Sequence, residues 1–426
     1  MKTWTPETPG YNQQRLGFQR RDPHQPAKIF GATSAADIQE AVRYARDHDL
    51  KLAVKATGHG HTRPTDAVLI TTSRFDDVTV DPGQRTATIQ AGASWQQVID
   101  AAAKHGLAPL SGSFPGVGAI SYTLGGGVGL MARRHGFAAD HVRRIEVVTP
   151  DGTLRNAEGD LFWALRGGGG NFGIVTELEV DLFPVTTLFG GSLYYELPAT
   201  PGILETWREW TATVPDEVTS AVAIVPFPDI PPVPAPLRGK YVAQVSLSIL
   251  GSNGEELIQP LRAIGTPLLD TVGEIPYTES GRIFAEPERP DAYGARNVLL
   301  NQLDPAALAT IPKLAGPEAA AMCVVMIRHL GGALARPPKE PNAVGHRDAA
   351  YSLTVLTPGE NDAAELHRAV LDPWQPYVVG RSLNFSFAPL DQHQVSEAYE
   401  KTTHDRLLQL RNTYDPTRML QPNHQL

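Results

Sequence analysis

Two spacings of apolar residues divide the chain into two regions. From residue 27 to about residue 184, segments with helical spacing alternate with short apolar segments that are typical of strands. Residues 34–45 and 94–102 predict helices, and each starts with a serine that can cap it. Residues 52–54 and 86–90 predict strands. We therefore expect one unit of alternating helices and strands over this region.

From about residue 185 the pattern changes to that of longer antiparallel strands with helices between them. Residues 192–196, 241–249 and 351–356 alternate between apolar and polar side chains, as such strands do. Residues 226–236 are dense in proline, which cannot pair in a central strand, so they predict a loop. The fold class that we predict for this second region, and for the chain as a whole, is α+β.

A polar tail completes the predicted organisation. Residues 392–413 have the pattern of one long polar helix, and Tyr414-Asp415-Pro416 then forms a stop signal. We place the boundaries of the three parts at residues 1–185, 186–383 and 384–426.

Composition excludes several classes of protein. The chain has 426 residues, of which 42% are hydrophobic and 19% charged, as in folded domains. Its net charge of −9 argues against a nucleic-acid partner, because phosphate binding needs clustered Lys and Arg. The one cysteine, Cys323, rules out an internal disulfide framework. No segment has the apolar length of a membrane span, so we expect no membrane partner and a cytoplasmic location. The sequence leaves the oligomeric state open.

Three glycine-rich loops follow one another at the ends of predicted elements. They cover residues 55–61, residues 112–118 continued by 125–129, and residues 166–173. Glycine allows a ligand to approach the backbone closely. Successive backbone N–H groups in such loops form a concave site for a diphosphate without many lysines. That kind of site suits a dinucleotide bound by an acidic protein.

The third loop contains a G-x-G-x-x-G pattern at Gly168, Gly170 and Gly173, but its context is inverted. A nicotinamide fingerprint needs a strand before the glycines and a helix after them. Here residues 160–165 predict a helix before the loop, and residues 174–180 predict a strand after it. The pattern is therefore not a nicotinamide-binding site.

The first loop offers a metal site as a competing interpretation. His59 and His61 could both ligate a metal ion through their imidazoles. No Asp, Glu or Cys completes the set at ligand spacing, since the nearest carboxylate is Asp66. We predict no metal site.

Taken together, these motifs resemble the FAD-linked oxidases of the vanillyl-alcohol oxidase superfamily, most closely the berberine-bridge-enzyme-like branch. The resemblance runs from about residue 26 to 185 and returns in the tail at residues 414–416 and 423–425. It implies a PCMH-type FAD-binding domain of two subdomains, and a substrate domain whose antiparallel sheet is covered by helices. The residues that it assigns to FAD binding are Lys55, Ala56, Thr57, Gly58, His59, Gly60, His61, Gly112, Ser113, Val117, Gly118, Gly125, Gly126, Gly127, Asp140, Gly169, Gly170, Asn171, Gly173, Ile174, Val175, Asn384 and Asn423.

The resemblance also gives particular roles to His59, Phe114 and Val117. His59 aligns with the histidine that is bonded to the flavin 8α-methyl group in many relatives. Bicovalent relatives carry a cysteine where this chain has Phe114, so we expect a covalent bond through His59 only, with noncovalent FAD as the alternative. Val117 lies near the reactive edge of the flavin in relatives, where a small valine accompanies access of O2.

The catalytic base does not carry over from the family. Relatives often show Tyr-x-Asn-Tyr where this chain has Ser382-Leu383-Asn384-Phe385, so both tyrosines are missing. A general base must lie within hydrogen-bond reach of the substrate proton. The candidates that the sequence offers are Tyr351, Tyr377, His329 and His346.

The resemblance implies an FAD-dependent oxidoreductase and favours an oxidase. A small-molecule alcohol, sugar or secondary metabolite would give a hydride to flavin N5, with O2 as the final acceptor. Three alternatives stay open at this point. They are a flavin-dependent dehydrogenase, an oxidative cyclase of a natural product, and a non-redox cyclase or ligand-binding module that holds FAD structurally.

Overall fold

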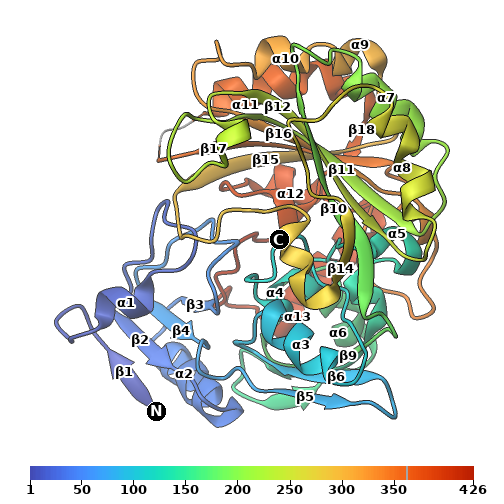
Figure 1. Cartoon of the computed structure of the whole chain (residues 1–426). Coiled ribbons are helices and arrows are strands. Elements are labelled where there is room, and N and C mark those ends of the chain that lie inside the picture. The colour runs from blue at the N-terminus through green and yellow to red at the C-terminus, as the bar shows by residue number, and fades with distance from the viewer. Residues whose placement is uncertain (361–362) are drawn as a thin grey trace.

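The computed structural model describes residues 1–360 and 363–426, which form three β-sheets with helices packed around them (Figure 1). In Figure 1 the two sheets of the N-terminal part lie below, and the largest sheet lies above them. Among the described residues, no helix is long and apolar enough to cross a membrane.

The first subdomain is built on a four-stranded sheet in the order β1-β2-β4-β3. Strands β2, β4 and β3 pair in parallel, and β1 joins them antiparallel. Helix α2 buries one apolar face, and its Ser34 cap accepts a hydrogen bond from the N–H of Asp37, as the sequence predicts. The elements are β1 (Lys2–Trp4), α1 (Tyr11–Arg15), β2 (Lys28–Gly31), α2 (Ala35–Asp47), β3 (Leu52–Lys55) and β4 (Val68–Thr71).

The second subdomain has its own five-stranded sheet, in the order β5-β6-β9-β7-β8, and all of its pairs are antiparallel. The single helix–strand unit expected over residues 27–184 is therefore two units, because β5 and β6 pair with β9 and not with the first sheet. The predicted capping box of Ser94 and Gln97 is present at the start of α3. The elements are β5 (Val78–Asp81), β6 (Thr86–Gln90), α3 (Trp95–Ala103), α4 (Ala119–Leu124), α5 (Ala132–His135), η1 (Ala138–His141), β7 (Val142–Val148), β8 (Leu154–Asn156), α6 (Gly159–Leu165) and β9 (Ile174–Asp181).

The third sheet has nine strands, with the order β13-β10-β12-β11-β16-β17-β15-β18 and with β14 also paired to β10. All of its pairs are antiparallel, as the alternating segments predict. Its strands are β10 (Thr187–Glu196), β11 (Val218–Pro226), β12 (Tyr241–Ile249), β13 (Leu269–Asp270), β14 (Gly273–Pro276), β15 (Tyr293–Leu300), β16 (Val324–His329), β17 (Tyr351–Pro358) and β18 (Val378–Gly380). Its helices are α7 (Ile203–Thr211), η2 (Ala235–Leu237), α8 (Gly254–Arg262), η3 (Tyr277–Arg282), α9 (Pro305–Leu308), α10 (Ile311–Leu314), η4 (Gly332–Ala335), α11 (Ala364–Leu371), η5 (Asp372–Tyr377) and η6 (Leu383–Phe385).

The nine-stranded sheet has one apolar face and one face of small and polar side chains. Leu353 and Val355 of β17 pack on the apolar face with Trp207 of α7, in a core covered by helices. Residues at the alternate positions face the second subdomain, since Ala221 and Met326 join its hydrophobic core. The polar residues at these positions include Ser192, Thr219, Gln244, Ser246, Ser248, Asn297, Arg328, Ser352 and Thr354.

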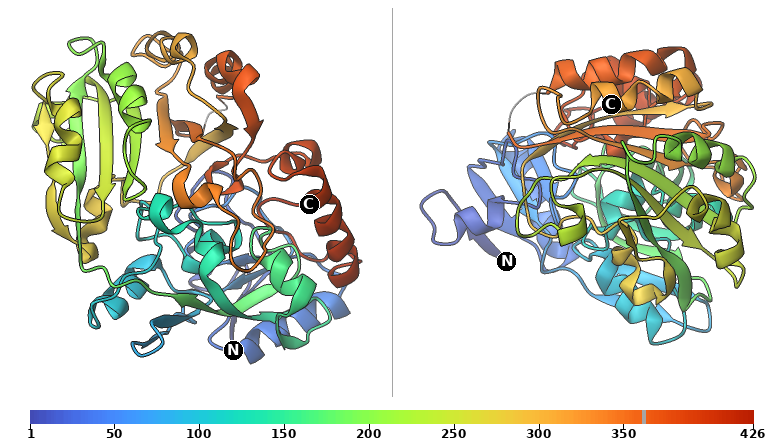
Figure 2. Two further views of the ribbon diagram at one scale, coloured as in Figure 1. Left: turned by 90° about the vertical axis from the view of Figure 1, so that its right-hand side faces the viewer. Right: turned by 45° about the horizontal axis from the view of Figure 1, so that its top comes forward.

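The tail returns to the two N-terminal subdomains. The N–H of Leu52 donates to the carbonyl of Met419, and the N–H of Gln421 donates to the carbonyl of Leu52. Helix α13 (Lys401–Tyr414) packs against α6, on the side of the molecule away from the green sheet strands in Figure 2, left. The boundaries proposed at residues 185 and 383 stay predictions.

The long helix expected over residues 392–413 is wrong in one respect, because it is interrupted. The structure has α12 (Gln392–Ser396) and then α13, with an extended Glu400 before α13. The carbonyl of Glu397 accepts hydrogen bonds from the N–H of Arg381 and from Nε2 of His346. Because this carbonyl accepts hydrogen bonds from residues outside the helix, the helix is interrupted between Ser396 and Lys401.

Gly92 joins the first two subdomains and supplies a stability test. Its N–H donates to the Phe75 carbonyl at 2.7 Å, and a Cβ added at Gly92 would lie 2.0 Å from the Thr72 carbonyl oxygen. We expect Gly92→Ala to lower the free energy of unfolding by about 1–3 kcal/mol, since backbone must move. Gly273→Ala is the control, because its Cβ would meet no atom within 4 Å. Urea unfolding of both variants checks this, and equal losses would contradict it.

Candidate active site

The three glycine-rich loops meet in one region. Loop 1 (residues 55–61) follows β3, loop 2 (residues 112–118 and 125–129) flanks α4, and loop 3 (residues 166–173) connects α6 to β9. The order of helix, loop and strand around loop 3 is the inverted order that the sequence predicts.

Hydrogen bonds and close backbone contacts hold the loops together. A Cβ on Gly118 of loop 2 would lie 3.6 Å from the Thr57 hydroxyl of loop 1. The N–H groups of Gly167 and Gly169 in loop 3 donate to the carbonyl of Leu124, at 2.9 and 3.1 Å. Segments that are far apart in sequence are thus placed side by side.

The C-terminal tail closes the same region. The Thr62 hydroxyl donates to the carbonyl of Asn423 at 2.8 Å. The Asn171 side chain donates to the carbonyl of His424 at 3.1 Å and accepts from the N–H of Leu426 at 3.2 Å. The predicted residues Asn171 and Asn423 therefore lie at the junction of the loops and the tail.

Loop 1 presents its backbone as a cradle for an anion. Gly58 has a φ of 69°, and a Cβ there would lie 2.6 Å from the Cα of Gly17, so glycine is required at this position. The N–H groups of residues 58–60 donate to no acceptor within residues 1–360 and 363–426. Space is open at Gly60, whose added Cβ would meet only Asn423, at 3.8 Å. Free N–H groups around open space suit the diphosphate of FAD.

His59 is half-buried among aromatic rings beside this cradle. Its ring stacks on Phe114 with centroids 5.1 Å apart and lies 4.3 Å from Phe18. Its carbonyl accepts a hydrogen bond from the Tyr293 hydroxyl at 2.6 Å, and its buried Nδ1 has no partner among the described residues. Burial lowers the pKa of His59 to about 4, so the imidazole is neutral at pH 7. A neutral nitrogen without a partner fits attachment to a flavin.

The other predicted members of loop 1 have partners or structural surroundings. His61 Nε2 lies 2.8 Å from the carbonyl of Asp22, and its ring lies 4.1 Å from that of His24. Burial lowers the pKa of Lys55 to about 8, with the nearby charge of Arg20 as a smaller cause. Among the described residues, no group of three or more His, Cys, Asp and Glu could hold a metal ion.

Asn384 lies in this region, but Asp140 does not suit contact with FAD. The Asn384 amide donates to the carbonyl of Tyr122 at 2.9 Å, and its oxygen lies where a Cβ on Gly125 would be. The Asp140 carboxylate instead accepts from Arg347, Asn342 and the N–H of Phe137. Its oxygens are thereby used within the protein, so its role is to hold the 137–140 turn.

The remaining residues predicted to bind FAD are two buried apolar residues and several loop glycines. Ile174 and Val175 are buried in two hydrophobic cores, so only their backbone can face a ligand. Gly126 and Gly127 have φ values of 106° and 79°, and Gly169 has 67°, which lets their loops turn sharply toward the same region. The other glycines assigned to FAD binding, Gly112, Gly170 and Gly173, lie in the same loops.

The structure brings two of the four predicted bases together, since the rings of His329 and Tyr351 stack with their centroids 5.5 Å apart. Tyr351 lies on the apolar face of the large sheet, where its hydroxyl lies 2.7 Å from that of Thr211. Tyr377 packs against the same core, and a hydrogen bond with Asp304 raises its pKa. Neither position faces the glycine loops, so neither suits a base acting there.

The two histidines differ from one another. His346 is fixed by the Glu397 carbonyl, 3.0 Å from its Nε2, and its N–H donates to Glu400. His329 lies at the end of β16, lines a narrow cavity with Ser113 of loop 2, and contacts Arg133 at 2.9 Å. Burial, and then the charge of Arg133, lowers the pKa of His329 to about 3, which makes it a weak base.

Sequence reasoning missed two groups beside loop 2, one on the large sheet and one on α4. Arg328 of β16 donates to the Ser113 hydroxyl at 3.2 Å, and the half-buried Tyr122 of α4 has a hydroxyl with no partner among the described residues. Burial raises the pKa of Tyr122 far above its usual value, with Tyr277 as a smaller cause. The signal that could have found Arg328 is the alternation of residues 324–329. In a strand, the side chain of Arg328 points to the face of the sheet opposite to that of the apolar Val325 and Ile327.

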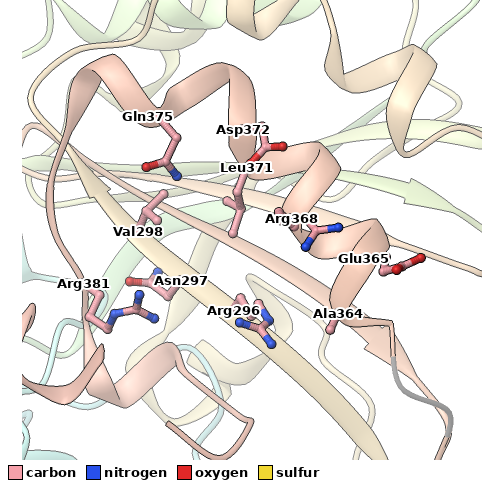
Figure 3. A pocket seen from close by; sticks show the side chains of 10 residues that line it. All are labelled: Arg296, Asn297, Val298, Ala364, Glu365, Arg368, Leu371, Asp372, Gln375 and Arg381. Atoms are coloured by element: carbon pink, nitrogen blue, oxygen red, sulfur yellow. The ribbon is translucent and has the colours of Figure 1, made fainter. Parts of the chain in front are cut away.

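A second cavity, of about 230 Å³, lies between β15, α11 and η5 (Figure 3). Val298 and Leu371 of its lining belong to the helix-covered core of the large sheet. Arg381, which also lines it, is paired with Glu397. The cavity contains none of the predicted catalytic residues, and it is separate from the glycine loops.

Comparison with known proteins agrees with this geometry. A family model described as an FAD binding domain matches residues 26–158. An FAD-linked oxidoreductase of Dictyostelium discoideum is 24% identical over 413 residues, which cover 93% of this chain and 88% of that protein. The structure of a 6-hydroxy-D-nicotine oxidase from Arthrobacter nicotinovorans matches with a TM-score of 0.84 at 23% identity, over 98% of this chain and 96% of that one.

Residues 26–158 therefore match an FAD binding domain, and the whole chain has the fold of FAD-linked oxidases such as the 6-hydroxy-D-nicotine oxidase. The chain is an FAD-dependent oxidoreductase with the PCMH-type fold and berberine-bridge-enzyme-like neighbours, so these predictions are confirmed. A further structural neighbour is the grass pollen allergen Phl p 4, which has glucose dehydrogenase activity and matches with a TM-score of 0.82 at 19% identity, over 99% of this chain and 96% of that one. An isoleucine-to-valine variant of Phl p 4 is a glucose oxidase.

Buried histidines should make this oxidoreductase sensitive to mild acid. Burial lowers the pKa of His24, His59, His135, His329 and His424 to about 3 or 4. The unfolded chain, with histidine pKa values of about 6.5, binds more protons below that pH. Stability is therefore fully present above pH ~6.5 and should fall as the pH drops toward ~4.

Thermal unfolding between pH 7.5 and 5 checks this expectation. His24→Gln should flatten the pH dependence by up to about one proton, because the substituted site no longer titrates. His48, which is exposed, supplies the control variant His48→Gln, and this variant should keep the wild-type slope. A melting temperature that is constant over this pH range would contradict the prediction.

Proposed function

We propose that this chain is an oxidase that holds FAD covalently through His59 alone and passes electrons from a small-molecule substrate to O2. The observation that carries the proposal is the half-buried, neutral His59, whose buried Nδ1 lacks a partner among the described residues, beside the free N–H groups of loop 1. When bound, the flavin supplies hydride acceptance at N5 and electron transfer to O2.

The chain's own residues supply binding and placement. The N–H groups of loop 1, with the turns of loops 2 and 3, bind the diphosphate, and Asn384 and Asn423 position the tail against it. His59 holds the ring system, and Phe114, stacked on His59, stands where a second tether would require a cysteine. The polar face of the large sheet, which contacts loop 2 through Arg328 and Ser113, would bind the substrate.

Val117 supports an oxidase over a dehydrogenase. It is half-buried in loop 2, where its N–H donates to the Phe114 carbonyl and its carbonyl accepts from the N–H of Trp95. In Phl p 4, an isoleucine-to-valine replacement accompanies glucose oxidase activity. A valine at position 117, next to the ring that His59 holds, would leave O2 the same kind of space.

The covalent bond has a direct test. Acid denaturation of the purified holoenzyme should leave the yellow flavin in the protein pellet, and His59→Ala should release it into the supernatant, because the tethering nitrogen is gone. His61→Ala is the matched control, since His61 already binds the Asp22 carbonyl, and it should keep the flavin in the pellet. Flavin released from the wild-type protein would refute the tether.

Oxygen reactivity is tested separately at Val117. We expect Val117→Ile to slow the reoxidation of chemically reduced holoenzyme by air at least ~10-fold, which corresponds to a barrier higher by about 1.4 kcal/mol. Val117→Ala should keep the wild-type rate, because it leaves the space open. Stopped-flow absorbance of the flavin measures both. A wild-type enzyme that reoxidises no faster than Val117→Ile would favour a dehydrogenase.

A further inference from the structure

Arg328 is the one charged residue at the loop-facing positions of strands β11, β12, β16 and β17, all of whose residues the structure describes. The register places it in a row of small side chains that crosses the sheet. This row consists of Ser192, Ser246, Ala221, Arg328 and Ser352. Small neighbours flank the guanidinium, which is the longest side chain in the row and lines the narrow cavity beside Ser113.

The half-buried Arg328 side chain has no neutralising partner among the described residues. Its recorded hydrogen bond is to the uncharged Ser113 hydroxyl, and its Nε is buried with no acceptor among the described residues. Burial lowers its pKa, and the charge of Glu286 opposes this shift, yet the described residues show no ion pair between the two. A desolvated charge without a partner is unfavourable, so a ligand that pairs with this guanidinium would stabilise the site.

The surroundings of Arg328 indicate what such a ligand would be. The cation lies 4.8 Å from the centre of the Phe284 ring and 4.6 Å from that of Phe385, so flat apolar surfaces flank it. The buried hydroxyls of Thr219 and Tyr122 also lack partners among the described residues. A guanidinium with a free Nε edge matches the planar pair of oxygens in a carboxylate.

We propose that Arg328 binds a carboxylate of the substrate, and that this oxidoreductase therefore acts on organic acids with a flat apolar body. The proposal rests on the function proposed above, because it takes the polar face of the sheet as the substrate side of the flavin. Ser113 and the two phenylalanine rings hold the guanidinium in place, so that its Nε edge can meet the acid.

Binding of simple probes to the holoenzyme tests the proposal. Benzoate and its uncharged analogue benzamide are titrated while the flavin absorbance spectrum and the melting temperature are recorded. Wild-type protein should bind benzoate at least ~10-fold more tightly than benzamide. Arg328→Met should weaken benzoate binding by about 10- to 100-fold and leave benzamide binding and flavin content unchanged. Arg328→Lys, which keeps the charge and loses the planar fork, should recover part of the affinity.

The control is Arg296→Met, since Arg296 lies on the opposite face of the sheet, next to the cavity of Figure 3, and it should leave benzoate binding unchanged. Equal binding of benzoate and benzamide by the wild type would overturn the proposal, and so would tighter binding of inorganic phosphate than of benzoate. Air reoxidation of the reduced enzyme is measured on the same samples. If air does not reoxidise the reduced flavin while the affinity for benzoate still depends on Arg328, the result contradicts the oxidase proposal and supports the carboxylate site.

Discussion

Close backbone approach at the three glycine-rich loops is the constraint on which the rest of the structure depends. Gly58 touches Gly17 through backbone atoms, so any side chain there would push loop 1 away from the N-terminal segment. The tail then joins loop 1 to loop 3 through Asn423 and Asn171. Residues far apart in sequence must therefore fold together before free N–H groups can face one ligand, which is why the tail belongs to the FAD site.

The two faces of the large sheet have different roles, one in stability and one in binding. Residues such as Leu353 and Val355 bury one face under helices, and this burial stabilises the sheet. Stability on that side allows the other face to carry Thr219, Ser246 and Arg328, which would be costly in a closed apolar core. Strand alternation thus supplies both a scaffold and a polar binding surface from the same strands.

The sequence predicts the local features well and the long-range ones poorly. Loop 1, the inverted context of loop 3 and the Ser94 capping box depend on residues close in sequence, and the structure has them as expected. The break before Lys401 depends on Arg381 and His346, which bond to Glu397 from elsewhere in the fold. Pairing of strands β5 and β6 with β9 is also long-range, so one predicted unit became two.

The choice of candidate bases shows where more could have been read from the sequence. Tyr351 lies two and four residues before Leu353 and Val355 in the same strand, so its side chain points to the same, apolar face of the sheet. The same rule applied to residues 324–329 assigns Arg328 to the opposite face. The alternation of side chains along a strand does not identify which face of the sheet meets the flavin, because that depends on how the sheet packs against loop 2. The contact of Arg328 with Ser113 shows which face of the sheet meets loop 2. Bound FAD and an organic acid would form hydrogen bonds with the unpaired groups on that face, and their binding would stabilise the folded state by mass action.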